Sequence, residues 1–273
     1  SYSYIKQIIL MVDHLVGFDT RKKNGTPLPT GYHPEEDTME LLCSSEITKY
    51  LQLVGIGQWL VTIGRIDIYH AINTMSRYKE VPRKGHLFNL IGIFKYLNKY
   101  KRRALRVTAR GMDLESLGAT LKHPSGSWQE YYPNVVEELD EKAPTQYGEP
   151  VETTIFVDAN HAGDHATRKS VTGMIIFVDG TPYRWFSRRQ TSVETSTYTA
   201  EFAALRVSVE QALGLRYTLR SMGIALSGPT RIVCDNSSVC TQASEPGSPF
   251  SQKHIAICFH KVRENVAAGT VNI

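Results

Sequence analysis

The spacing of apolar residues changes along this chain from a helical period to a strand period, and this change limits the possible folds most. Over residues 47–78 and 85–100, apolar residues recur every three or four positions. This spacing predicts amphipathic helices, with two of them meeting near Gly64. From Thr153 onward, β-branched and apolar runs replace the helical pattern, which predicts strands. We therefore expect a mainly helical region followed by an α/β region.

The α/β region is predicted to begin with three strands, and Asp179-Gly180 is typical of a tight hairpin between the second and third. A long helical pattern follows and ends before Gly223. In chain order we expect strands at 153–159, 171–178 and 182–187, a helix at 194–222, a strand at 231–234 and a helix at about 253–268.

Charge is distributed unevenly along the chain. Residues 1–110 contain 17 Lys and Arg against 9 Asp and Glu, residues 111–150 contain 2 against 8, and residues 151–273 contain 12 against 10. A basic first part favours a polyanionic partner, because neutralising phosphates dominates nucleic-acid affinity. The acidic middle part is rich in Pro and Gly. We interpret it as a linker between a helical region (1–110) and an α/β domain (151–273).

Cysteine spacing and hydropathy exclude several classes of protein. The 4 cysteines form no C-x-x-C pair, so neither a zinc site nor a disulfide framework is indicated, and we expect reduced thiols. No apolar run has membrane-spanning length and the start lacks a signal-peptide pattern, so we expect an intracellular protein without a membrane partner. Because the sequence has neither an initiating Met nor a closing signal, we expect it to be a piece of a longer chain.

Three carboxylates occupy positions where metal-dependent chemistry is expected. Asp158 comes at the end of the first predicted strand, Asp235 directly follows the strand at 231–234, and Glu201 lies in the first turns of the long helix. A lone charge at the end of an apolar strand is costly unless a cation or partner offsets it. Clustered carboxylates bind hard divalent ions, and two such ions can stabilise phosphodiester cleavage. The alternative interpretation is three solvated surface groups.

Residues 155–205 contain an Asp-Ala-x-x-Ala-Gly-Asp start at 158–164 and an Arg-Lys-Ser-x-x-Gly segment at 168–173. These motifs give the segment a resemblance to the ribonuclease H region of copia-type retrotransposon polyproteins. It continues through Cys-Asp-Asn at 234–236 and Lys-His-Ile at 253–255. Upstream, residues 57–68 and 82–87 are similar to the segment that follows the polymerase palm in the same reverse transcriptases. Several motifs in the same order are more specific than any single one.

The resemblance implies a ribonuclease H-like mixed sheet flanked by helices, preceded by a mainly helical thumb or connection region. It implies that Asp158, Glu201 and Asp235 are catalytic and bind Mg²⁺ or Mn²⁺, with two ions expected; Glu194 is the fallback for the helix position. The implied activity is cleavage of the RNA strand of RNA–DNA hybrids. The implied partners are the hybrid and the remainder of the polyprotein. The implied location of the protein is the cytoplasm, within a virus-like particle, or the nucleus.

The sequence departs from the family's pattern at two positions, Ala256 and Asn160, and Asn160 stands where a second Asp often follows the first strand. The family usually has Asp where this chain has Ala256, so we expect weakened metal binding. His254 and His260 are candidate auxiliary residues, with an ordinary packing role as the alternative. A degenerate fragment that binds hybrids without cleaving them is the second hypothesis, and a scaffold with the same fold is the third.

The polymerase site is missing, because no Tyr-x-Asp-Asp sequence occurs in the chain. The helical region is instead expected to follow a hybrid's backbone with basic side chains. An equally good explanation for those at the end of the 85–100 helix is a favourable interaction with its dipole. The candidate nucleic-acid-binding residues are Lys95, Lys99, Lys101, Arg102, Arg103 and Arg106.

Overall fold

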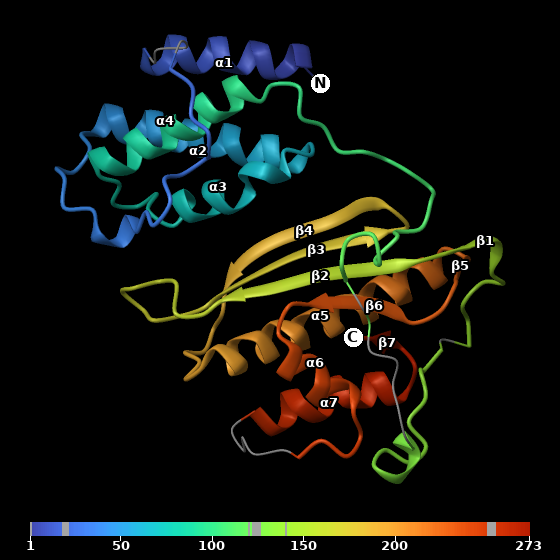
Figure 1. The fold of residues 1–273 in the computed structure, drawn as a ribbon. Helices are drawn as coiled ribbons and strands as arrows, with labels where there is room; N and C mark the ends of the chain where they lie inside the picture. Colours follow the sequence, from blue (N-terminus) through green and yellow to red (C-terminus); the bar gives the residue numbers. More distant parts are fainter. Residues whose placement is uncertain (1, 18–21, 120, 122–126, 140, 250–254) are drawn as a thin grey trace. The chain divides into compact units, whose positions relative to one another are not determined.

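The computed structural model describes residues 2–17, 22–119, 121, 127–139, 141–249 and 255–273, which form two compact units (Figure 1). Unit 1 comprises Ser1–Leu105 and Asp164–Ala166, and unit 2 comprises Arg106–Gly163 and Thr167–Ile273. Unit 1 is helical, whereas unit 2 combines a sheet with helices. In the described part of the chain, no helix is both long and apolar enough to cross a membrane.

Unit 1 is built from helices whose apolar faces meet. Its described helices are α1 (Tyr2–Val16), α2 (Ser44–Thr62), α3 (Tyr69–Ser76) and α4 (Lys84–Lys99), with 3-10 turns at Pro34–Glu36 and Ile66–Ile68. The predicted pair of helices meeting near Gly64 is confirmed as α2 and α3. Gly64 has φ +110, a conformation that a residue with a side chain rarely adopts.

The core of unit 1 lies between α2, α3 and α4. Tyr50, Leu53 and Phe94 are fully buried there, and the hydroxyl of Tyr50 donates a hydrogen bond to the carbonyl of Met75 at 2.7 Å. This hydrogen bond satisfies the buried Tyr50 hydroxyl, as burial of a polar group requires. Gly57 allows α2 to approach α3 closely, since a Cβ at this position would lie 2.2 Å from a side-chain carbon of Ile72.

Unit 2 is organised around a mixed five-stranded sheet with the order β4-β3-β2-β6-β7. Strands β2, β3 and β4 are antiparallel neighbours, while β6 runs parallel to β2 and β7 runs parallel to β6. A separate two-stranded parallel sheet pairs β1 with β5. The strands are β1 (Tyr147–Val151), β2 (Thr153–Asn160), β3 (Val171–Val178), β4 (Thr181–Arg189), β5 (Ile224–Leu226), β6 (Thr230–Cys234) and β7 (Val271–Asn272).

One face of this sheet is covered by the long helix α5 (Thr197–Ser221), against which α6 (Ser237–Ser244) and α7 (Ala256–Ala267) pack (Figure 1). Alternate residues of β2 point toward α5, so Ile155 and Val157 are buried against Phe202 and Leu205. The hairpin at Asp179-Gly180 joins β3 to β4 as predicted, with Asp179 at φ 51. These elements form a ribonuclease H-like mixed sheet flanked by helices, preceded by a helical region.

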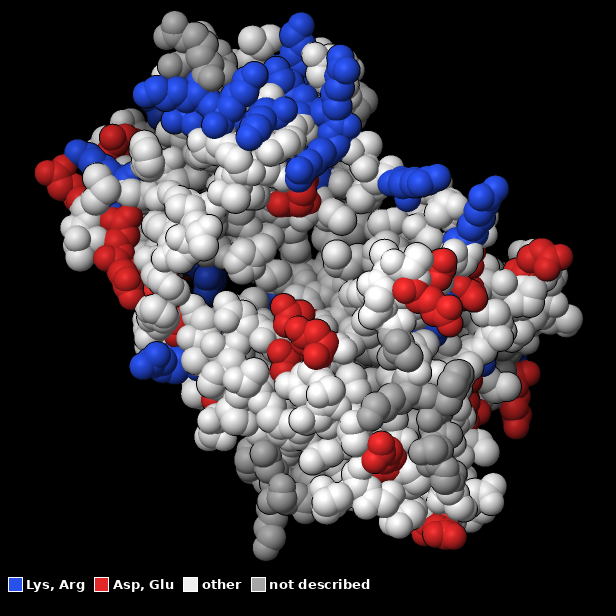
Figure 2. Space-filling view, in the orientation of Figure 1, with Lys and Arg blue, Asp and Glu red and all other residues white. Residues whose placement is uncertain are grey.

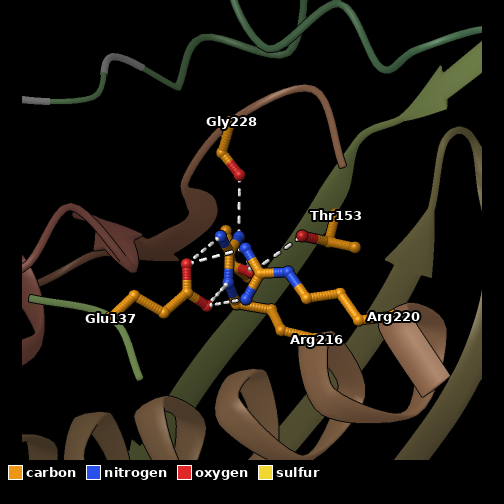
Figure 3. Close-up of polar contacts among 6 residues, drawn as sticks. Glu137, Thr153, Arg216, Arg220 and Gly228 are labelled. Atoms are coloured by element: carbon orange, nitrogen blue, oxygen red, sulfur yellow. Dashed lines mark hydrogen bonds and ion pairs between the residues drawn. The ribbon is translucent and has the colours of Figure 1, made fainter. Parts of the chain in front are cut away.

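The described residues of 111–150 do not form a free linker, which differs from the expectation. We call residues 127–139 the strap, because they are fixed to unit 2 near both of their ends. Trp128 lies in the core of unit 2 and is only 9% exposed. At the other end, the Glu137 carboxylate binds Arg216 and Arg220 of α5 (Figure 3).

The difference has a physical reason. Pro, Gly and acidic residues lower the average hydropathy of 111–150, and an average does not reveal a single buried Trp or a paired carboxylate. The structure also divides the chain between Leu105 and Arg106, earlier than the expected end of the helical region at residue 110. As a result, β1 and the strap belong to unit 2.

Candidate active site

Two adjacent parallel strands bring Asp158 and Asp235 to the same edge of the sheet. β2 and β6 are paired with Val157 aligned to Cys234, so the residues that follow these two, Asp158 and Asp235, lie side by side. Asp158 lies two residues before the end of β2 and is paired across the ladder with Gly173, which has no side chain to crowd it. Both carboxylates are exposed.

Glu201 approaches the same edge from α5, where it is the fifth residue of the helix. Its side chain is buried, with only 5% of the residue exposed. The carboxylate accepts a hydrogen bond from the backbone N–H of Ala159. Its second oxygen, Oε2, is buried and has no hydrogen-bond partner among the described residues.

The charge environment of Glu201 is unfavourable for its ionised form. Burial, followed by the negative charges of Asp158 and Asp235, raises the pKa of Glu201 to about 7. Removing a carboxylate from water is costly unless hydrogen bonds or a positive charge compensate. A cation beside Oε2 would supply that compensation.

Cys234 is a member of this group that the sequence analysis did not include. Ligand atoms of Glu201, Cys234 and Asp235 all lie within 4.8 Å of one another. Because side chains alternate along a strand, Cys234 points to the same side as the buried Ile232 and toward α5. The signal available in the sequence was this alternation, which places the residue before Asp235 on the α5 side of β6.

The segment after β6 explains why Asp235 is held at the edge. Asn236 is the N-cap of α6, and its side-chain oxygen accepts a hydrogen bond from the backbone N–H of Val239 at 3.2 Å. Such a cap fixes the first turn of a helix. Asp235 is therefore confined between the end of β6 and the start of α6.

The remaining predicted site residues lie elsewhere or are not described. Glu194 precedes α5 in a bend, where its carboxylate accepts a hydrogen bond from Ser192 at 2.6 Å. The ring of His260 is hydrogen-bonded to the Tyr132 hydroxyl at 2.8 Å. His254 lies outside the described residues. Ala256 is the first residue of α7.

Most of the predicted basic residues gather in unit 1, at and beyond the end of α4. Figure 2 shows Lys and Arg side chains concentrated on this unit, drawn at the top. A shallow pocket of about 450 Å³ is lined by Tyr2, Lys23, Asn98, Lys99, Tyr100, Lys101, Arg102 and Arg103. Lys95 instead lies over the ring of Phe88, 5.6 Å from its centre. Arg106 belongs to unit 2.

Some of these cations have structural partners. The guanidinium of Arg103 lies 4.0 Å from the ring centre of Tyr100 and 3.8 Å from a carboxylate oxygen of Asp67. Lys99 is the basic residue of the last turn of α4, where it complements the helix dipole. Lys101 and Arg102 follow the end of α4, and the guanidinium of Arg102 lies 5.5 Å from the ring centre of Tyr2.

The fold is that of a ribonuclease H-like α/β unit preceded by a helical region. The chain is homologous to retrovirus-related Pol polyproteins of transposons, which confirms the resemblance to copia-type retrotransposon polyproteins. It is 26% identical over 226 residues, 83% of the chain, to the retrovirus-related Pol polyprotein from transposon RE1 of Arabidopsis thaliana. It is 25% identical over 252 residues, 89% of the chain, to the corresponding polyprotein from transposon TNT 1-94 of Nicotiana tabacum.

These relatives are much longer than the chain. The matched region covers 13% of the Arabidopsis polyprotein and 16% of the tobacco one. No protein-family model matches the chain, and no solved structure matches it. The homology therefore connects this chain to a portion of a retrotransposon polyprotein.

Proposed function

We propose that unit 2 is a metal-dependent endonuclease of the ribonuclease H type that cleaves the RNA strand of RNA–DNA hybrids during reverse transcription. The observation that carries the proposal is the buried, unpartnered Oε2 of Glu201, which lies near the negative charges of Asp158 and Asp235. Neighbouring carboxylates whose repulsion is uncompensated without a cation are typical of a metal-binding active site.

Asp158, Glu201 and Asp235 would hold magnesium or manganese, with two ions expected. Bound divalent ions lower the pKa of water and stabilise the charge that develops on a phosphodiester. The chain's own contribution is positioning: β2 and β6 fix the two Asp residues at one edge, and α5 supports Glu201 behind them. Ribose 2′-hydroxyls in a wide, shallow minor groove would distinguish the hybrid from duplex DNA.

The basic residues of unit 1 support the hybrid as a partner. Lys99, Lys101 and Arg102 line the pocket beyond α4, and side chains of this kind bind phosphates with little regard to sequence. We propose that they bind the backbone of the hybrid outside the cleavage site. Because the chain has no Tyr-x-Asp-Asp sequence, it would act on a hybrid that another part of the polyprotein makes.

Cleavage of a labelled hybrid tests the proposal directly. A hybrid with a labelled RNA strand should be cut in the presence of Mg²⁺, and Asp158→Asn should reduce the rate by at least a hundredfold. Asp179→Asn is the matched control, because Asp179 lies in the β3–β4 hairpin. An intact hybrid at micromolar wild-type protein would contradict the proposal.

A second candidate function rests on Ala256. This residue begins α7 where the family's pattern has Asp, so the chain could be a fragment that binds hybrids without cutting them. In that case hybrid affinity would depend strongly on salt but would not change with Asp158→Asn. A strong gain of cleavage in Ala256→Asp would instead show that the rest of the site is intact.

A further inference from the structure

We propose that Cys234 makes the carboxylate cluster a binding site for a thiophilic divalent cation, zinc in particular, with Glu201 and Asp235 as the other ligands. The inference rests on the metal site of the proposed function and adds a ligand and a class of ion to it. The spacing of cysteines in the sequence indicated no zinc site, because the other ligands here are carboxylates: Asp235 follows Cys234 directly, and Glu201 comes from α5.

The distances permit one ion to contact all three residues. Their ligand atoms lie within 4.8 Å of one another. Zinc binds thiolate sulfur at about 2.3 Å and carboxylate oxygen at about 2.0–2.2 Å, so two ligands of one tetrahedral ion are separated by about 3.3–3.7 Å. A small adjustment of side chains therefore closes the cluster around an ion.

The state of the Glu201 carboxylate is a second observation that points to a cation at this place. Glu201 is 5% exposed and its Oε2 has no hydrogen-bond partner among the described residues. A buried carboxylate oxygen in this state is rare in stable proteins, because its desolvation is not compensated. Glu201 belongs to the same cluster as the Cys234 sulfur, so one cation could bind both side chains, and the Cys234 thiol would give up its hydrogen bond with Cys240.

The chemistry of the ligands determines the class of ion. Magnesium binds oxygen ligands and gains nothing from a thiol, whereas thiolate ligands favour zinc and other soft ions. On binding, a Zn–S bond would form as the S–H bond of Cys234 breaks, with the proton passing to solvent. Two carboxylates and a thiolate leave zinc a position for water or a phosphate oxygen.

Zinc and magnesium would then compete for the same carboxylates. Glu201 and Asp235 are required by both, while Asp158 is outside the three-residue cluster that includes the thiol. A zinc ion held by Cys234 would lie away from Asp158. It would occupy Glu201 and Asp235, and two hard ions could then no longer bind among the three carboxylates. Zinc is therefore expected to inhibit magnesium-dependent cleavage.

Binding can be measured without any assay of activity. The full chain, reduced and then freed of reductant, is titrated with Cd²⁺ as a spectroscopic probe for zinc, and the ultraviolet thiolate-to-metal charge-transfer band is recorded. We expect a saturable band at one equivalent in the wild type and in Cys258→Ser and Cys43→Ser. The band should be absent in Cys234→Ser and Cys234→Ala.

Calorimetry with Zn²⁺ gives the affinity. Cys234→Ala should weaken binding at least tenfold, and Glu201→Gln should weaken it by a similar factor. Thermal unfolding of each variant checks that it is folded, and Cys234→Ser provides a second variant if the alanine protein is unstable. A band that persists in both Cys234 variants, or unchanged zinc affinity, would overturn the inference.

The outcome is independent of the nuclease test. Cleavage with Mg²⁺ but no Cys234-dependent Cd²⁺ band would reject the zinc site and leave the proposed function standing. A Cys234-dependent band in a chain that does not cut hybrids would support the zinc site and count against the nuclease.

Discussion

At the residue scale, the buried carboxyl group of Glu201 lies in surroundings that disfavour its ionised form. Its helix buries it beside the edge of the sheet, and burial together with Asp158 and Asp235 raises its pKa to about 7. A carboxyl group whose pKa is raised in the folded protein ionises more easily in the unfolded chain. Its contribution to stability is therefore present below about pH 4.5 and is lost as the pH rises toward 7.

The substitution Glu201→Gln should stabilise the metal-free protein at pH 8. The amide keeps the shape and can still accept a hydrogen bond from Ala159, but it carries no charge to bury. The pKa shift corresponds to about 3 kcal/mol of unfolding free energy. Urea unfolding in the presence of a chelator at pH 8 and at pH 5 measures this, and the gain should fall below about 1 kcal/mol at pH 5.

Glu194→Gln is the matched control for this prediction, because Glu194 lies in the bend before α5 and is outside the cluster. It should leave the unfolding free energy nearly unchanged at both values of pH. A Glu201→Gln protein that is less stable than the wild type at pH 8 would show that the carboxylate is already compensated.

The candidate site was only partly predictable at this scale. The order of motifs indicated Asp158, Glu201 and Asp235, because strand ends and a helix start are visible as changes of pattern. The proximity of Cys234 to Glu201 was not predictable from cysteine spacing, since the packing of α5 on β6 brings these two residues together, whereas Asp235 simply follows Cys234 in sequence. The partner of His260, Tyr132, is 128 residues away in sequence.

At the element scale, the strap is attached to α5 by a network of charged hydrogen bonds. Arg216 is only 3% exposed, and it donates two hydrogen bonds to the Glu137 carboxylate at 2.7 and 2.8 Å and one to the carbonyl of Gly228 at 2.7 Å (Figure 3). Arg220 also binds Glu137 through two nitrogens. One carboxylate therefore compensates two guanidinium groups.

Glu137→Gln should destabilise unit 2 strongly. Removing one partner of a buried ion pair leaves the other charge uncompensated, at a cost of about 3–5 kcal/mol. Urea unfolding at pH 7 measures the loss. The neighbouring Glu138 is exposed, so Glu138→Gln should change the unfolding free energy by less than about 0.5 kcal/mol. Equal effects of the two substitutions would contradict the role given to Glu137.

The same network predicts a specific response to acid. Burial alone would raise the pKa of Glu137, but the hydrogen bonds and charges of Arg216 and Arg220 outweigh it and lower the pKa to about 2. A lowered pKa stabilises the folded state at pH above about 4.5, and the stabilisation is lost as the pH falls toward 2. Wild-type stability should therefore decline over this range more steeply than that of Glu137→Gln, as followed by circular dichroism.

The elements themselves were largely predictable where the apolar pattern is long. The structure confirms α4, α5 and the β3–β4 hairpin within a few residues of their predicted bounds. The short strands β1, β5 and β7 were not predicted, because two to five residues are too few to show a period. Helix α6 is embedded in a Ser-rich segment, where its N-cap Asn236 was the main signal.

At the scale of the whole molecule, the proposed functions are divided between the two units. The carboxylates are in unit 2 and the pocket beyond α4 is in unit 1. Phosphate contacts make nucleic-acid affinity depend on salt, by about 0.9 in the slope of log affinity against log salt per contact in duplex DNA. Affinity and cleavage should therefore respond to different substitutions.

The triple substitution Lys99→Gln, Lys101→Gln, Arg102→Gln should weaken hybrid binding and reduce the salt slope by about 2–3. The cleavage rate at saturating hybrid should change little, because these residues are not in the unit that holds the carboxylates. Fluorescence anisotropy at several salt concentrations measures the slope. Lys79 is exposed and lies outside the pocket, so Lys79→Gln should have almost no effect on it.

The attachment of the strap also has a consequence for the order of folding. Glu137 and its two arginines are separated by 79 and 83 residues, so this contact closes a long loop and α5 must be in place before it can form. Contacts of this kind are absent from a transition state built on local structure. The attached strap is therefore expected to slow unfolding. Glu137→Gln should accelerate unfolding many-fold while refolding proceeds at nearly the wild-type rate.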